Sequence, residues 1–152
     1  MKRFISIGGL LLAALIVGGC QHWLPSDGWT TVIDGDKGLE NFNRVGDANW
    51  RAEGGAIVAD KGKGGHLVTK KSYKDFEIRA EFWAVTETQS GIFFRISDVN
   101  KVGAATAYEA NIYDTRPGQE YATGAIVNFA SVPVPIVYKA GTPKGRWNVM
   151  EI

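Results

Sequence analysis

Apolar and polar side chains alternate most clearly in the stretch Phe76-Glu77-Ile78-Arg79-Ala80-Glu81-Phe82-Trp83-Ala84. Every even position is apolar, and most odd positions are charged. A period of two is typical of a β-strand that buries one face and exposes the other. The stretch therefore predicts a strand that turns its even positions toward a core and its odd positions toward solvent.

Two later stretches repeat this alternation. Gly91-Ile92-Phe93-Phe94-Arg95-Ile96 places Phe93 and Arg95 on the face opposite its apolar even positions. Tyr108-Glu109-Ala110-Asn111-Ile112-Tyr113 turns Glu109 and Asn111 outward in the same way. If these strands are neighbours in one sheet, their outward side chains form a charged platform, made of Glu77, Arg79, Glu81, Arg95, Glu109 and Asn111.

Short strands and frequent turns run through the rest of the chain. Further strand candidates are 29–33, 50–52, 56–59, 66–69, 125–129, 136–138 and 147–152. The chain has 19 glycines and no helical periodicity of useful length. Strands this short and numerous favour two stacked sheets. The sequence thus predicts an all-β protein, built as an antiparallel β-sandwich or jelly roll.

The N-terminus has the three parts of a secretory signal peptide. Lys2 and Arg3 give a positive start, residues 5–17 are mainly apolar, and Val17-Gly18-Gly19-Cys20 is a small-residue processing site. The apolar run, about 13 residues and roughly 20 Å as a helix, is shorter than the roughly 20 residues that cross a bilayer. We therefore expect residues 1–19 to be a signal helix that is removed.

Cys20 is the only cysteine, and its place after two glycines resembles the lipobox of bacterial lipoproteins. The resemblance implies that its thiol is acylated and that residues 20–28 form a lipidated tether to a membrane. An ordinary signal peptide with an incidental cysteine is the alternative. Gln21 stands where an inner-membrane retention signal would place Asp, so the resemblance implies the cell envelope, at the outer membrane.

Residues 29–152 are expected to form one domain. Without Lys2 and Arg3, 15 of the 17 basic residues remain against 16 acidic ones. The basic residues are not clustered, so nucleic-acid binding is not expected. The chain stops within the strand-like run 146–152, which would leave strand edges exposed. We therefore expect that the last strands of the domain are lacking.

Four groups of residues occur in the order and spacing of a known family. They are Gly65–Thr69 with Tyr73–Phe82, Gln89–Arg95, Tyr108–Asp114 with Thr123–Ala125, and Gly145–Asn148 with Glu151–Ile152. Together they resemble the bacterial 3-keto-disaccharide hydrolase domain, over nearly the whole of residues 20–152. The resemblance implies a jelly roll of the concanavalin or laminin-G type. The chain departs from the family at Gln89, where Asn is usual, and at Asn111, where Gln is usual.

The resemblance implies an enzyme that cleaves 3-keto-glycosides. A ketone at C3 of the sugar acidifies the proton on C2, so a base can remove that proton and the enolate can expel the C1 aglycone, after which water adds back. This chemistry needs a base, a group that stabilises the oxyanion, and groups that hold sugar hydroxyls. A non-catalytic carbohydrate-binding or surface-scaffold module is the alternative, since sandwich folds serve both roles.

Three charged residues are the candidate catalytic groups. The planar guanidinium of Arg95 could hold a keto oxygen or a carboxylate, or could pair with a carboxylate across the sheet. Glu109 and Glu81 are candidate general bases, because loss of water and a neighbouring carboxylate both raise the proton affinity of a carboxyl group. Solvated surface charge is the alternative for both.

Four residues are candidates for substrate binding. Asn111 carries the amide of the third group of residues, and Trp83 shares the outward register of Glu81 and could stack on a sugar. Ser90 offers a hydroxyl without a basic partner in the sequence, so a serine nucleophile is not expected. Asp114 could hold a sugar hydroxyl or a divalent cation, or form an Asx turn.

A metal site of the zinc type is not expected. His22 and His66 have no His, Cys or carboxylate neighbours at the spacing of metal ligands. The sequence indicates no cofactor, and it leaves a divalent cation at Asp114 open.

Overall fold

The computed structural model of the chain describes residues 28–84, 88–113, 120–132 and 146–152. The chain divides into two compact units, Met1–Thr31 and Val32–Ile152. The expected signal peptide, Cys20 and most of the expected tether lie outside the described residues. Within the described residues, no helix has the length and hydropathy of a membrane span.

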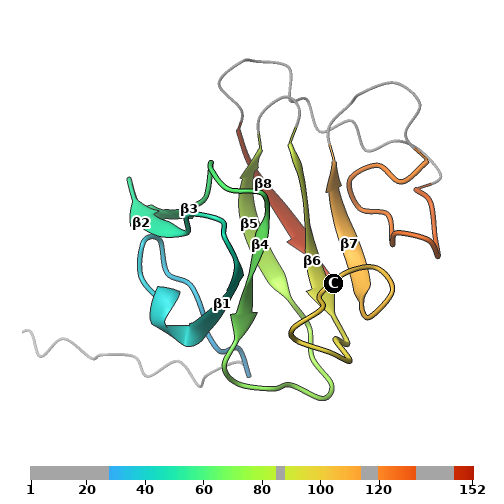
Figure 1. Cartoon of the computed structure of the whole chain (residues 1–152), viewed down its shortest axis with the longest axis horizontal. Coiled ribbons are helices and arrows are strands. Elements are labelled where there is room, and N and C mark those ends of the chain that lie inside the picture. The colour runs from blue at the N-terminus through green and yellow to red at the C-terminus, as the bar shows by residue number, and fades with distance from the viewer. Residues whose placement is uncertain (1–27, 85–87, 114–119, 133–145) are drawn as a thin grey trace, which may run out of the picture. The chain divides into compact units, whose positions relative to one another are not determined.

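The described part of Val32–Ile152 consists of eight strands and a single turn of 3-10 helix (Figure 1). In chain order these are η1 (Leu39–Asn41), β1 (Phe42–Gly46), β2 (Arg51–Glu53), β3 (Ala56–Val58), β4 (Gly65–Thr69), β5 (Arg79–Ala84), β6 (Gln89–Phe94), β7 (Tyr108–Tyr113) and β8 (Arg146–Glu151). The strand pairs are β1 with β4, β2 with β3, β5 with β8 and β6 with β7, and each pair is antiparallel. The predicted all-β, antiparallel β-sandwich is confirmed.

Most of the predicted strands coincide with these elements, two differ, and one lies outside the described residues. The run 125–129 forms a tight turn in which Ile126 bridges Ala110 of β7 and Ala130, since Asn128 adopts a left-handed φ of 67° that ends the extended chain. The run 29–33 is not a strand. The run 136–138 lies outside the described residues. β1 was not predicted, because its sequence does not alternate.

The exposure of β5 follows the alternation in its sequence. Its odd positions are exposed, its even positions are partly buried, and Ala84 is buried. β5 pairs with β8 from Arg79 opposite Glu151 to Ala84 opposite Arg146. β5 therefore has one face toward the core and one toward solvent, as predicted.

The core lies between the β5–β8 pair and the β6–β7 pair. Ala84 of β5 and Ile112 of β7 are 1% and 5% exposed and form one hydrophobic cluster, against which Phe82 and Met150 pack. In Figure 1, β8 passes behind β6. The two pairs are thus the facing layers of the sandwich, and each has an outer face made of the residues that alternate with the core residues.

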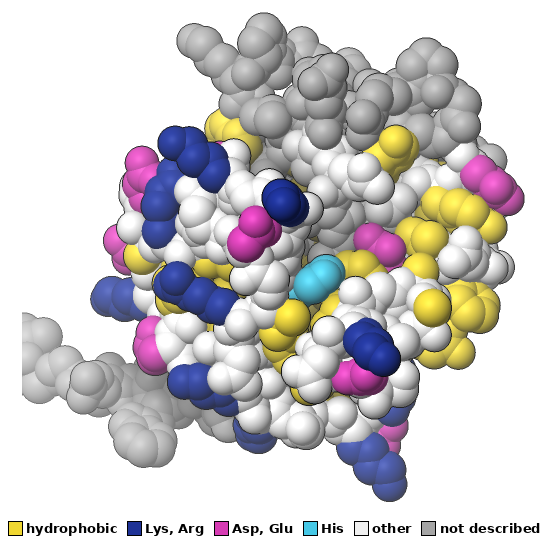
Figure 2. Space-filling model, in the orientation of Figure 1, with side chains coloured by type: hydrophobic (Ala, Val, Ile, Leu, Met, Phe, Trp, Pro, Cys, Tyr) yellow, Lys and Arg dark blue, Asp and Glu magenta, His cyan; other side chains and the backbone are white. Residues whose placement is uncertain are grey.

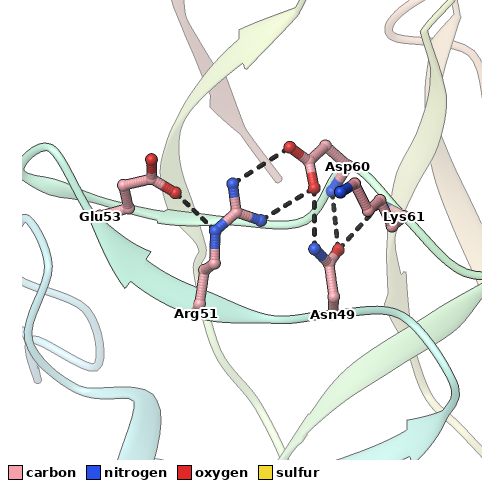
Figure 3. A network of polar contacts seen from close by, with 5 residues as sticks. All are labelled: Asn49, Arg51, Glu53, Asp60 and Lys61. Atoms are coloured by element: carbon pink, nitrogen blue, oxygen red, sulfur yellow. Dashed lines mark hydrogen bonds and ion pairs between the residues drawn. The ribbon is translucent and has the colours of Figure 1, made fainter.

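A polar network braces the loop after β3 against β2 (Figure 3). The Arg51 guanidinium donates to both carboxylate oxygens of Asp60, at 2.9 and 3.1 Å, and also to Glu53. The Asn49 side chain accepts the backbone N–H groups of Asp60 and Lys61 and donates to the Asp60 carboxylate. Hydrogen bonds from Arg51 and then Asn49 lower the pKa of Asp60 from 3.8 to about 2. The network fixes this loop.

Candidate active site

The outer face of the β6–β7 pair carries the most buried of the predicted catalytic groups. On this face lie the odd positions of both strands, namely Gln89, Gly91, Phe93, Glu109, Asn111 and Tyr113; we call it the Glu109 face. Glu109 stands opposite Phe93, and Asn111 stands opposite Gly91. The even positions Ala110 and Ile112 are buried on the core side. The Glu109 face is therefore the side of β6–β7 that turns away from the core.

The side chain of Glu109 lies over Gly91. A Cβ atom at position 91 would be 2.7 Å from Glu109 Oε1 and 2.8 Å from Glu109 Cγ. Because glycine has no side chain, the carboxylate can lie close against the backbone of β6. Glycine at this position thus sets where the Glu109 carboxylate lies.

Partial burial changes the acidity of Glu109. The residue is partly exposed, and desolvation raises its pKa above the ordinary glutamate value of 4.5. Desolvation disfavours the charged form, so the carboxylate binds a proton more readily than a solvated one does. A carboxylate with raised proton affinity that remains open to solvent is suited to act as a general base.

Asn111 is held by its surroundings. It is 8% exposed, and its Nδ2 donates to the carbonyl of Tyr121 at 2.6 Å. Its backbone also bonds to the next segment, by Asn111 N–H to Ala125 O and Gly124 N–H to Asn111 O. The Asn111 amide nitrogen therefore anchors the segment that follows β7, although it lies on the face where the sequence predicted a substrate-binding amide.

His66 joins the Glu109 face from another strand. Its imidazole meets the ring of Phe93 edge to face, with 5.2 Å between centroids and an interplanar angle of 88°. Phe93 is the cross-strand partner of Glu109. Sequence reasoning missed this placement, because Leu67 and Val68 are adjacent apolar residues and β4 has no clean alternation. Figure 2 shows histidine, acidic and hydrophobic side chains exposed on one side of the molecule, and Lys and Arg side chains mainly over the strands β1 to β4.

Arg95 does not follow the predicted alternation. It comes directly after β6 and has a left-handed φ of 57°, which turns its side chain out of the register of Phe93. Its guanidinium donates to Lys74 O at 2.6 Å, pairs with Asp75 at 3.4 Å and lies 5.4 Å from the centre of the Phe76 ring. Among the described residues, its ion pair and hydrogen bonds all go to positions 74 and 75. The expected convergence of Arg95 with Glu109 is therefore wrong.

Glu81 and Trp83 lie on the other side of the sandwich. Both occupy odd positions of β5 and are exposed, whereas Phe82 and Ala84 face the core that β5 shares with Ile112 of β7. The expected single platform is wrong for this reason: β5 pairs with β8 and not with β6 or β7. Two carboxylates on opposite outer faces cannot raise each other's proton affinity at one site.

Trp83 instead meets a second tryptophan. It stands opposite Trp147 of β8, with 5.7 Å between ring centroids and an interplanar angle of 79°. The two residues are 48% and 52% exposed, and Val149 beside them is 54% exposed. The outer face of β5–β8 therefore presents a pair of half-exposed indole rings.

The remaining predicted site residues are not brought to Glu109. Ser90 is exposed and has the parity of Ile92, so its side chain lies on the face of β6 opposite the Glu109 face. Asp114 lies outside the described residues. Within the described ranges, no group of three or more His, Cys, Asp or Glu side chains is arranged to hold a metal ion.

The chain is therefore an antiparallel β-sandwich protein, and Glu109 is a partly buried carboxylate on one of its outer sheet faces. A family model for the 3-keto-alpha-glucoside-1,2-lyase-like domain matches residues 28–152, and the chain belongs to that family. The resemblance seen in the sequence is thereby confirmed. Comparison with curated proteins and with solved structures gave no match.

Proposed function

We propose that the protein cleaves 3-keto-glycosides by elimination, with Glu109 as the general base. Family membership supports the substrate class. A base removes the proton on C2, which the C3 ketone acidifies, and the C1–O bond then breaks. The product is an unsaturated keto sugar to which water can add, so the reaction gives net hydrolysis.

The position and environment of Glu109 are the observation that carries the proposal. Glu109 is the carboxylate on the described β6–β7 surface whose pKa burial raises, and Gly91 lets it lie against the sheet. Proton transfer by a positioned side chain contributes about 10²–10⁴-fold to the rate. Replacing Glu109 should therefore lower the rate of cleavage by at least about 100-fold.

Two neighbours supply what a base alone lacks. Phe93, opposite Glu109, offers an aromatic ring on which the C–H face of a sugar can pack. Gln89, two positions before Gly91 on the same face, is exposed and carries an amide N–H that can donate to a keto oxygen. These groups favour a neutral sugar ring lying along β6.

Cleavage of a 3-keto-glucoside by the full-length protein tests the proposal. Chromatography would follow release of the aglycone from 4-nitrophenyl 3-keto-α-glucoside for the wild type, Glu109→Gln and Glu81→Gln. Glu81→Gln is a matched control, because it removes an exposed carboxylate from the outer face of β5. We expect loss of at least 100-fold for Glu109→Gln and little change for Glu81→Gln. Equal rates for the two variants would refute the role of Glu109.

A second candidate function is carbohydrate binding without cleavage, which the Trp83–Trp147 pair favours. Half-exposed indole rings are suited to pack against sugar rings. Calorimetric titration with unmodified and 3-keto sugars separates the two functions. Binding that Trp83→Ala abolishes, with no aglycone released, would support the binding module.

Attachment to the cell envelope through Cys20 is a further part of the proposal. The sequence Val17-Gly18-Gly19-Cys20 supports it, because a lipobox cysteine is acylated and acyl chains give membrane affinity of about 0.8 kcal/mol per buried methylene. Labelled palmitate should enter the wild-type protein and not Cys20→Ser, and the wild type should fractionate with outer membranes. Equal membrane association of the variant would contradict an acyl anchor.

A further inference from the structure

His66 and Glu109 are both neighbours of the Phe93 ring and come from different strands. Glu109 of β7 is the cross-strand partner of Phe93. The imidazole of His66 from β4 packs against the same ring in a T-shaped arrangement, with 5.2 Å between the ring centroids. Directly opposed residues in an antiparallel pair have Cβ atoms about 4.5–5.5 Å apart. A ligand that lies over Phe93 would thus be close to both the carboxylate and the imidazole.

Elimination from a glycoside moves two protons. One leaves C2, and one must reach the glycosidic oxygen, because an alkoxide is too basic to depart readily at neutral pH. The two protons are exchanged at C2 and at the oxygen on C1, which are neighbouring positions of the same sugar. A base and an acid that both neighbour the Phe93 ring can therefore act on one sugar bound over that ring. Histidine can supply the second proton, because a protonated imidazole is a common general acid in enzymes.

We propose that His66 is the general acid that protonates the departing aglycone, an inference that rests on the proposed function of Glu109. The C2–H bond breaks and its proton goes to the Glu109 carboxylate. The electron pair left at C2 forms the C1=C2 double bond, and the pair of the breaking C1–O bond goes to the glycosidic oxygen. That oxygen takes a proton from the His66 imidazolium, so atoms and charge balance without a further reactant. Proton exchange with water restores both side chains.

The basicity of the leaving group tests this role. A 4-nitrophenolate leaves without help, whereas an alkoxide needs a proton donor. We would compare 4-nitrophenyl and methyl 3-keto-α-glucosides with the wild type, His66→Gln and Glu109→Gln. For His66→Gln we expect kcat/KM to fall at least 100-fold with the methyl glycoside and less than about threefold with the nitrophenyl glycoside. For Glu109→Gln we expect both to fall alike.

The outcomes separate this inference from the proposed function. If His66→Gln slows both substrates equally or slows neither, His66 is not the acid, and the role of Glu109 stands. If the wild type cleaves neither substrate, the proposed function fails and this inference fails with it. His66→Phe, which keeps an aromatic ring against Phe93, serves as a second variant should His66→Gln unfold. Its leaving-group dependence should match that expected for His66→Gln, and thermal unfolding would establish that each variant is folded.

Discussion

Gly91→Ala should disable the site while leaving the fold intact. The new Cβ would stand 2.8 Å from Glu109 Cγ, whereas carbon atoms pack best at about 3.5 Å or more. The Glu109 side chain must therefore retreat by about 0.7 Å. A misplacement of roughly 1 Å can cost about 10²-fold in rate, so kcat/KM should fall by one to two orders of magnitude.

The stability of Gly91→Ala should change little. Alanine is favoured over glycine in a strand by about 0.5–1 kcal/mol, and moving one partly exposed side chain off its rotamer costs about 0.5–1.5 kcal/mol. These terms offset each other to within about 1 kcal/mol, which is a shift in Tm of about 5 °C or less. The nearest backbone atom, Ala110 O at 3.1 Å, needs to yield by only a few tenths of an ångström.

The assay is release of 4-nitrophenol from the 3-keto-α-glucoside, with thermal unfolding of the same samples. Gly103→Ala is the matched control, because nothing lies within 4 Å of a Cβ at that position. Full activity of Gly91→Ala would show that the position of the Glu109 carboxylate does not matter. A large loss of stability would show that the backbone, and not the side chain, gives way.

Further predictions concern proton affinity and stability. Burial raises the pKa of Glu109, so stability should fall as the pH rises through that raised pKa, and urea unfolding should show that Glu109→Gln removes this fall. The pKa of Asp60 is lowered from 3.8 to about 2, so its contribution to the free energy of unfolding is present above about pH 4 and lost as the pH falls toward 2. Asp60→Asn should remove this loss of stability between pH 4 and pH 2 in urea unfolding. Thr123 Oγ1 donates to Tyr113 O at 2.7 Å and accepts Tyr113 N–H at 2.9 Å, so Thr123→Val should cost about 1–3 kcal/mol in urea unfolding, and a loss below 0.5 kcal/mol would contradict this. Arg95→Ala should lower Tm through loss of its contacts to residues 74–76 and change kcat/KM less than about threefold; a 100-fold loss would restore Arg95 to the catalytic groups.

Local alternation was enough to predict several elements and faces. The even positions of β5 face the core and its odd positions face solvent because successive side chains on an extended chain point in opposite directions. The same rule placed Glu109 and Asn111 on the face of β7 that turns away from Ala110 and Ile112, although Asn111 is buried there and bonds to the segment after β7. The family was also recognisable, because its motifs keep their order and spacing along the chain.

Local rules failed where a single backbone angle departs from the strand. The left-handed φ of Arg95 ends the register of β6 and sends the guanidinium toward Lys74 and Asp75. The left-handed φ of Asn128 likewise ends the extended conformation of the run 125–129 after β7. Arg95 is not of a residue type that favours a left-handed φ, so its residue type does not predict the turn. Asn adopts this conformation more often than most residues do, but a single Asn does not by itself predict where a strand ends.

The amino-acid sequence by itself determined which side chains share a face of each strand, since that depends only on the two-residue repeat of an extended backbone. Which faces meet was decided by the tertiary structure. Pairing of β5 with β8, and of β6 with β7, put the core between Glu81 and Glu109 and brought His66 to Phe93. Strand pairing joins residues far apart in the chain, and burial of the whole apolar surface selects it, so no local repeat encodes it.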